Sequence, residues 1–201
     1  MQINTNFTIS NFFIIISAFF LALNIFFPEL NIYNILALHS YYFEAEKYLM
    51  IPFQMIFANF LHADIFHLLF NSVFIFIFWN QVEKYIWRKK YILFFLFSSF
   101  IIGSVIIALN MWINIFWHYF STWATIWISG FAMALLAYYT LILWSKWIDE
   151  YKWWIMAIFL NIMIWFTGSV SFTGHLFWAI AGILFYFLIK NKIKKENLLE
   201  L

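Results

Sequence analysis

The stretch TIWISGFAMALLAYYTLILW, from Thr125 to Trp144, decides the fold class of this chain. It contains no charged residue, and its length is roughly the 20 residues that a helix needs to cross a bilayer. A Ser-Gly pair, Ser129 and Gly130, lies near its start. The sequence therefore predicts a membrane helix with a serine hydroxyl near its start, and that hydroxyl is either a packing group or a nucleophile.

The composition of the whole chain supports a polytopic α-helical membrane protein. Of its 201 residues, 66% are hydrophobic and 10% are charged, whereas a soluble domain carries about 25% charged residues. The chain has no cysteine, which excludes disulfides and thiolate sites. The net charge of +2 comes from scattered basic residues, and this excludes a clustered nucleic-acid-binding face.

Six stretches have the length and hydropathy expected of spanning helices. They are about Asn11–Phe27, Ile65–Val82, Tyr91–Leu109, Ser129–Trp144, Trp153–Phe166 and Leu176–Ile189. Pro28 ends the first, and the Asp64 carboxylate is expected to cap the second. The first stretch lacks a basic start and a clear cleavage site, so we interpret it as a retained helix and not a signal peptide.

Basic residues indicate the orientation, because Lys and Arg are enriched in cytoplasmic loops. Three groups of them follow the second, fourth and sixth spans, while Lys47 alone falls on the other side. We expect both termini to be cytoplasmic in a multi-pass protein of the plasma membrane. Residues 1–201 are then one membrane domain, with a core at about 48–189 and a short basic tail at 190–201.

The unusual polar residues share one predicted depth. His62 precedes the second span, and His67 and Asn71 lie four apart on one face of it. Ser129 begins the fourth span and His175 begins the sixth. Since these three spans all enter from the outer side, the groups lie just inside the outer leaflet. A serine and a histidine provide a nucleophile and a base, and the second histidine and the asparagine provide donors for a developing oxyanion.

Small residues favour close helix packing around these groups. Gly130, Ala134 and Ala137 form a smooth strip on the fourth span, and Gly174 and Gly182 bracket His175 on the sixth. Such strips let helix backbones approach each other closely.

Three motifs, in order and covering about residues 48–189, resemble the rhomboid intramembrane serine proteases. The segment FLHADIFHLLFNSVFIFIFWNQVEKYI (60–86) is similar to the family's second-helix motif, H-x-x-x-x-H-x-x-x-N followed by V-E. The ISG at 128–130 resembles the end of G-x-S-G. GHLFWAIAG (174–182) resembles the last-helix H-x-x-G-x-x-x-G.

This resemblance implies hydrolysis of peptide bonds in single-span membrane proteins near the outer leaflet. Ser129 would be the nucleophile and His175 the general base. The side chains of His67 and Asn71, with the Ser129 backbone N–H, would form the oxyanion hole. The resemblance implies no cofactor and no metal, and it leaves the role of His62 and the oligomeric state open.

Several family positions differ in this chain. Pro52-Phe53-Gln54 stands where the family often has P-W-R, so an anchoring arginine is missing. Met133 replaces the aromatic residue that usually follows the serine by four. Four family glycines correspond to tryptophans, which are Trp79, Trp87, Trp127 and Trp178.

Two hypotheses explain these four tryptophans. In one, the tryptophans are genuine and the protein is an inactive rhomboid-like pseudoprotease that binds membrane clients. In the other, UGA encodes glycine in the source lineage, which would also explain 12 Trp beside 5 Gly. Enrichment of Trp at membrane interfaces accounts for other tryptophans, but not for Trp178 within a packing strip. A third function, a small transporter or channel, would predict intramembrane acids or internal repeats, and the sequence shows neither.

Overall fold

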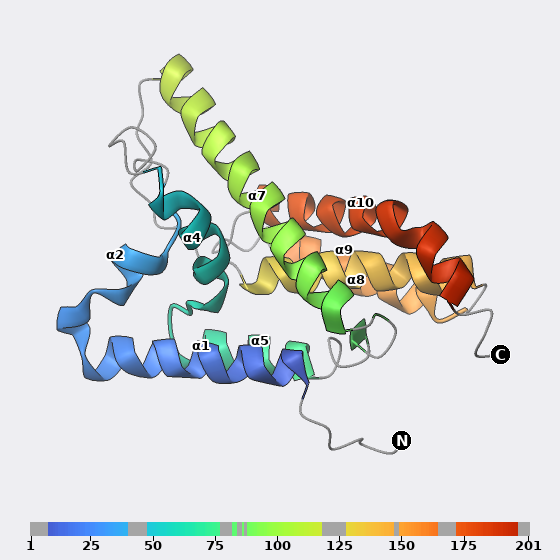
Figure 1. The fold of residues 1–201 in the computed structure, drawn as a ribbon, viewed down its shortest axis with the longest axis horizontal. Coiled ribbons are helices and arrows are strands. Elements are labelled where there is room, and N and C mark those ends of the chain that lie inside the picture. The colour runs from blue at the N-terminus through green and yellow to red at the C-terminus, as the bar shows by residue number, and fades with distance from the viewer. Residues whose placement is uncertain are drawn as a thin grey trace. The chain divides into compact units, whose positions relative to one another are not determined.

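The computed structural model describes residues 8–39, 48–76, 82–83, 86, 88–117, 128–146, 149–164 and 172–196. These residues are almost entirely helical (Figure 1). The chain divides into two compact units, Met1–Ser129 and Gly130–Leu201.

Each of the six predicted spans corresponds to a helix. The helices are α1 (Ile9–Phe26), α5 (Ile65–Phe74), α7 (Arg88–Trp117), α8 (Ile128–Ser145), α9 (Tyr151–Ile164) and α10 (Phe172–Glu196). Among the described residues, Ile9–Phe26 and Arg88–Leu109 are each long and apolar enough to cross a membrane. The all-α polytopic membrane fold is therefore confirmed, while the count of six spans stays a prediction.

The start of α1 is held by a local cap and by a distant carboxylate. The Thr8 side chain accepts a hydrogen bond from the first turn. The Glu83 carboxylate accepts the backbone N–H groups of Ile9 at 2.9 Å and Ser10 at 3.0 Å, and also the Ser10 hydroxyl. That hydroxyl lies 3.0 Å from the Tyr91 hydroxyl of α7. Glu83 thus joins α1, α7 and the segment before α7 at one end of the first unit.

The predicted outer loop contains short helices. They are η1 (Pro28–Leu30), α2 (Ile32–Leu36), α4 (Met50–Phe57) and η2 (Ala58–Phe60). The fully buried Gln54 side chain connects two of them. Its amide nitrogen donates to the Ile35 carbonyl at 3.0 Å, and its oxygen accepts the His39 backbone N–H at 3.3 Å. Gln54 therefore fastens the end of α2 to α4.

Contacts between α4, η2 and α7 bring their backbones close together. A Cβ atom added at Gly103 of α7 would lie 2.9 Å from the Met55 sulfur, so the Met55 side chain would have to shift to admit one. The buried Asn59 amide donates to the Ser99 hydroxyl of α7 at 3.1 Å. The helices α4 and η2 are thus packed on α7.

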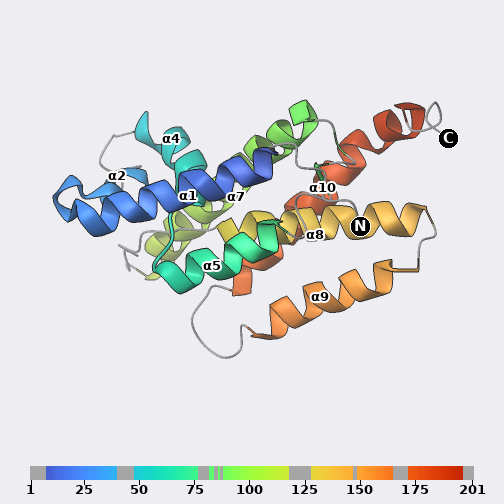
Figure 2. The ribbon, with the colours of Figure 1, turned by 90° about the horizontal axis from the view of Figure 1, so that it is seen from below.

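The helix α5 begins after a sharp bend. Segments Met50–Phe60 and Ile65–Val73 are inclined to each other by 80°. The Asp64 carboxylate accepts the His67 backbone N–H at 2.8 Å, which confirms the cap expected from the sequence. Beyond the bend, α5 lies beside α1 (Figures 1 and 2).

In the second unit, α8 packs between α9 and α10 through aromatic contacts. Tyr138 of α8 lies against Phe185 and Tyr186 of α10, with ring centroids 5.8 and 6.1 Å apart. Tyr139 meets Trp154 of α9 edge to face at 5.0 Å, and α8 and α9 run side by side in Figure 2.

Candidate functional site

Two nitrogen donors lie on one face of α5. The Ala63 backbone N–H donates to His67 Nδ1 at 3.4 Å. A neutral imidazole carries its proton on the nitrogen that does not accept, so in the neutral ring the proton belongs to Nε2. One turn further along, the amide nitrogen of Asn71 is buried and makes no hydrogen bond to any described residue. These two side chains therefore offer N–H groups from positions four residues apart.

His62 supports the His67 ring. It is fully buried in the connector before α5, and its Nδ1 lies 3.3 Å from the Phe60 carbonyl. The two imidazoles meet edge to face with centroids 5.1 Å apart. His62 is thus positioned to restrict the orientation of His67, a role that its place in the sequence motif did not reveal.

The predicted nucleophile lies at a boundary. Ser129 is in the first turn of α8 and is the last residue of the first unit. Its side chain lies outside the described part of the structure, as do residues 118–127 before it. Its pairing with His175 stays a prediction.

The second unit contains the predicted base. His175 lies in the first turn of α10 and is buried, with 7% of its surface exposed. Met133 of α8, which stands at the family's aromatic position, is also buried. Gly174 lies beside His175 in the helix.

The predicted small-residue strip forms the contact between α8 and α10. A Cβ atom on Gly182 would lie 2.9 Å from the Ala134 Cα and would overlap the Ala134 carbonyl oxygen. At this point the two helices touch backbone to backbone, which is possible because both residues are small.

One turn away, an indole occupies the same contact. A Cβ atom on Gly130 would lie 2.6 Å from Cε2 of Trp178 and would overlap other atoms of the ring. Trp178 is only 1% exposed, and its ring also meets Phe131 edge to face. The position that is glycine in the family motif therefore holds a fully buried indole. Trp79, Trp87 and Trp127 lie outside the described residues.

The remaining side chains of this region do not suggest a metal centre. The described residues contain no group of three His, Asp or Glu side chains that could hold a metal ion.

Two positions acquire roles that the sequence did not assign. Gln54, at the family's arginine position, fastens the outer loop, and Glu83 of the V-E motif caps α1. The motif resemblance marked both positions. Their partners could not be inferred from the sequence, because Gln54 bonds residues 15 and 19 positions away and Glu83 bonds residues more than 70 positions away.

These features define a polytopic α-helical membrane protein with histidine and asparagine donors at the start of one helix and a buried histidine on another. The family model of the Rhomboid domain matches residues 52–192 of this chain. This region covers well over half of the chain, and the protein belongs to the rhomboid family, whose members are typically intramembrane serine proteases. A comparison with curated proteins finds no match.

Proposed function

We propose that this rhomboid-family protein is an intramembrane serine protease that cleaves single-span membrane proteins. The observation that carries this proposal is the pair of N–H donors on α5. In the neutral His67 ring the proton belongs to Nε2, and the buried Asn71 amide bonds to none of the described residues. Donors arranged in advance of the reaction are what stabilise an oxyanion.

The proposed reaction follows the logic of a serine–histidine dyad. The Ser129 hydroxyl attacks the carbonyl carbon of the scissile peptide bond, while His175 takes its proton. The negative charge on the former carbonyl oxygen is stabilised by His67, Asn71 and the Ser129 backbone N–H. His175 then protonates the departing amine, and water hydrolyses the acyl-enzyme by the same two steps.

Labelling with a fluorophosphonate tests this proposal. The membrane-embedded protein is expected to be labelled, and Ser129→Ala is expected to abolish labelling. His67→Ala and Asn71→Ala are each expected to slow cleavage of a reporter substrate by a factor of about 10²–10³. Thr140→Ala, which removes a buried hydroxyl on the same helix, is the matched control and should leave labelling intact. Equal labelling of the protein and of Ser129→Ala contradicts the assignment of the nucleophile.

The second candidate function, a pseudoprotease that binds clients without cutting them, is favoured by Trp178. Its indole fills the space against Gly130, and Gly130 directly follows the proposed nucleophile. A glycine at position 178 would leave that space open, so the double change Trp178→Gly and Trp127→Gly is expected to raise fluorophosphonate labelling. Absence of labelling before and after this change would support the pseudoprotease.

The codons at positions 79, 87, 127 and 178 decide whether these tryptophans are genuine. UGA at all four would identify them as glycines in a lineage that reads UGA as glycine, and the protease proposal would then apply to the glycine-bearing chain. UGG at positions 79, 127 and 178 would end the recoding hypothesis.

A further inference from the structure

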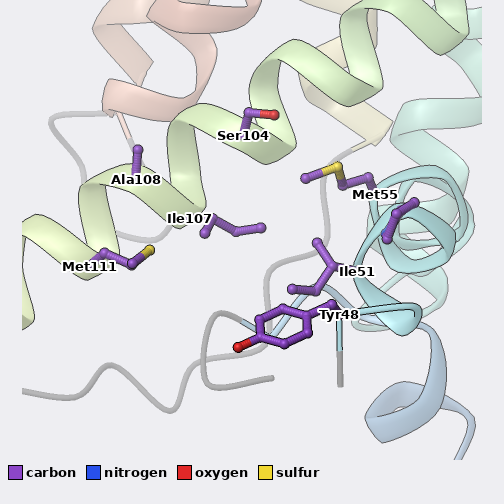
Figure 3. Close-up of a pocket in the computed structure, with 8 residues that line it drawn as sticks. Tyr48, Ile51, Met55, Ser104, Ile107, Ala108 and Met111 are labelled. Atoms are coloured by element: carbon purple, nitrogen blue, oxygen red, sulfur yellow. The ribbon is translucent and has the colours of Figure 1, made fainter. Parts of the chain in front are cut away.

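An apolar cavity in the first unit lies between α4 and α7, and none of its described lining residues is a proposed catalytic residue. Its volume is about 320 Å³. Figure 3 shows Ile51 and Met55 of α4 and Ile107 of α7 pointing toward one another into it. These three residues are buried, whereas Pro52, Ser104 and Ala108 at the edges are exposed. The cavity is therefore a slot whose floor is buried and whose rim is open.

The two ends of the slot are lined by different residues. At one end, Met55 packs against Gly103, where a Cβ atom would lie 2.9 Å from the thioether sulfur. At the other end, Tyr48 precedes α4 and lines the slot together with Met111 of α7 (Figure 3). The side chain of Tyr48 is 51% exposed.

The depth of the two ends follows from the length of α7. The helix starts with the basic residues Arg88, Lys89 and Lys90, which mark one membrane interface. At about 1.5 Å per residue, Gly103 lies about 23 Å and Met111 about 35 Å along the helix from Arg88. A hydrocarbon core is about 30 Å thick. The Met55 end of the slot thus lies within the hydrocarbon, and the Tyr48 end lies near the opposite interface, where tyrosine is a preferred residue.

We propose that this slot binds one acyl chain of a phospholipid in the leaflet opposite the basic end of α7. The chain enters with its methyl end toward Met55, and its ester end lies beside Tyr48. The lining suits a flexible hydrocarbon, because Met55 and Met111 are unbranched and adapt to irregular partners. A cavity of about 320 Å³ holds less than one turn of a helix, because a cylinder about 10 Å wide and 5.4 Å high occupies about 420 Å³. The proposal is independent of the proposed proteolysis.

Photolabelling of the full chain tests the proposal directly. The protein is reconstituted into phosphatidylethanolamine–phosphatidylglycerol vesicles that contain one of two phospholipid probes. One probe carries a diazirine at the methyl end of an acyl chain, and the other carries it beside the ester. With the labelled residue located by fragmentation of the peptides, the first should modify Ile51 or Met55, and the second should modify Tyr48 or Met111. Identical labelling by both probes overturns the proposal. In a parallel sample, a transmembrane peptide that carries a diazirine is added to the vesicles, and labelling of the slot by this peptide in preference to lipid also overturns the proposal.

A filled slot provides the second measurement. Ala108→Trp places an indole at the rim, while Leu109→Trp adds the same group at the exposed neighbouring position of α7. After purification in detergent, native mass spectrometry should show one retained phospholipid on the parent protein and on Leu109→Trp. Ala108→Trp should lower its occupancy about tenfold, which corresponds to about 1.4 kcal/mol. Equal retention by both variants overturns the proposal, and Ser104→Phe replaces Ala108→Trp if that variant does not fold.

Discussion

At the scale of single residues, the buried Glu83 side chain holds the start of α1 through hydrogen bonds. Its carboxylate accepts two backbone N–H groups and one hydroxyl, and its side chain is 5% exposed. Glu83→Gln replaces one acceptor oxygen with an amide group that faces donors. We expect it to lower the free energy of unfolding in detergent by about 2 kcal/mol, because hydrogen bonds to charged groups contribute about 1.5–3 kcal/mol. Glu29→Gln, at an exposed position, is the control, and an equal loss in both variants would refute this role.

His39 predicts a pH dependence of the outer loop. Burial lowers the pKa of His39, and the backbone groups of Tyr33 and Asn34, which act to raise it, offset this effect only in part. The unfolded loop therefore binds more protons than the folded loop below the ordinary histidine pKa of about 6.5, and stability falls as the pH drops through that value. Amide exchange at Leu36 and Leu38, corrected for intrinsic rates, should accelerate at about pH 5.5 relative to about 7.5. His39→Gln should remove this difference, and its persistence in the variant would assign the effect to another group.

At the scale of helices, the contact between α8 and α10 depends on the absence of a side chain at position 182. Gly182→Val would force a branched side chain into the backbone of Ala134, which no rotamer change can relieve. The expected loss of about 3 kcal/mol in unfolding free energy exceeds the gain in helix propensity, which is only about 0.4 kcal/mol because valine is itself a weak helix former. Ile183→Val, at the exposed next position, should have little effect, as measured by the same detergent unfolding. Unchanged stability in Gly182→Val would mean that the two helices can separate without loss.

The same scale shows how far the sequence predicts the fold. Long apolar stretches identify α1, α7 and α8 because membrane helices need little beyond length and hydropathy, and Asp64 identifies the start of α5 through a local cap. The helices of the outer loop were not predicted, since they depend on tertiary contacts such as that of Gln54 with Ile35. The site shows the same division. Spacing placed His67 and Asn71 on one face, but the packing of His62 on His67 requires the bend before α5.

At the scale of the whole molecule, the distribution of basic residues predicts which side of the membrane each loop faces. The chain has no cysteine, so single cysteines report accessibility without background. Leu49 in the outer loop is 93% exposed, and Lys146 after α8 is also exposed. In intact cells, a membrane-impermeant maleimide should label Leu49→Cys and leave Lys146→Cys unlabelled until the membrane is opened.

This orientation bears on the proposed chemistry. The predicted topology places His67, in the first turn of α5, on the same side of the membrane as Leu49, because the predicted outer loop leads into α5 through the bend at Leu61–Asp64. Labelling of Leu49→Cys from outside would therefore place the α5 donors near the outer leaflet, where the substrate's peptide bond would have to be presented. Labelling of Lys146→Cys alone in intact cells would show that the protein has the opposite orientation in the membrane. The proposed substrates would then have to be cleaved near the cytoplasmic face.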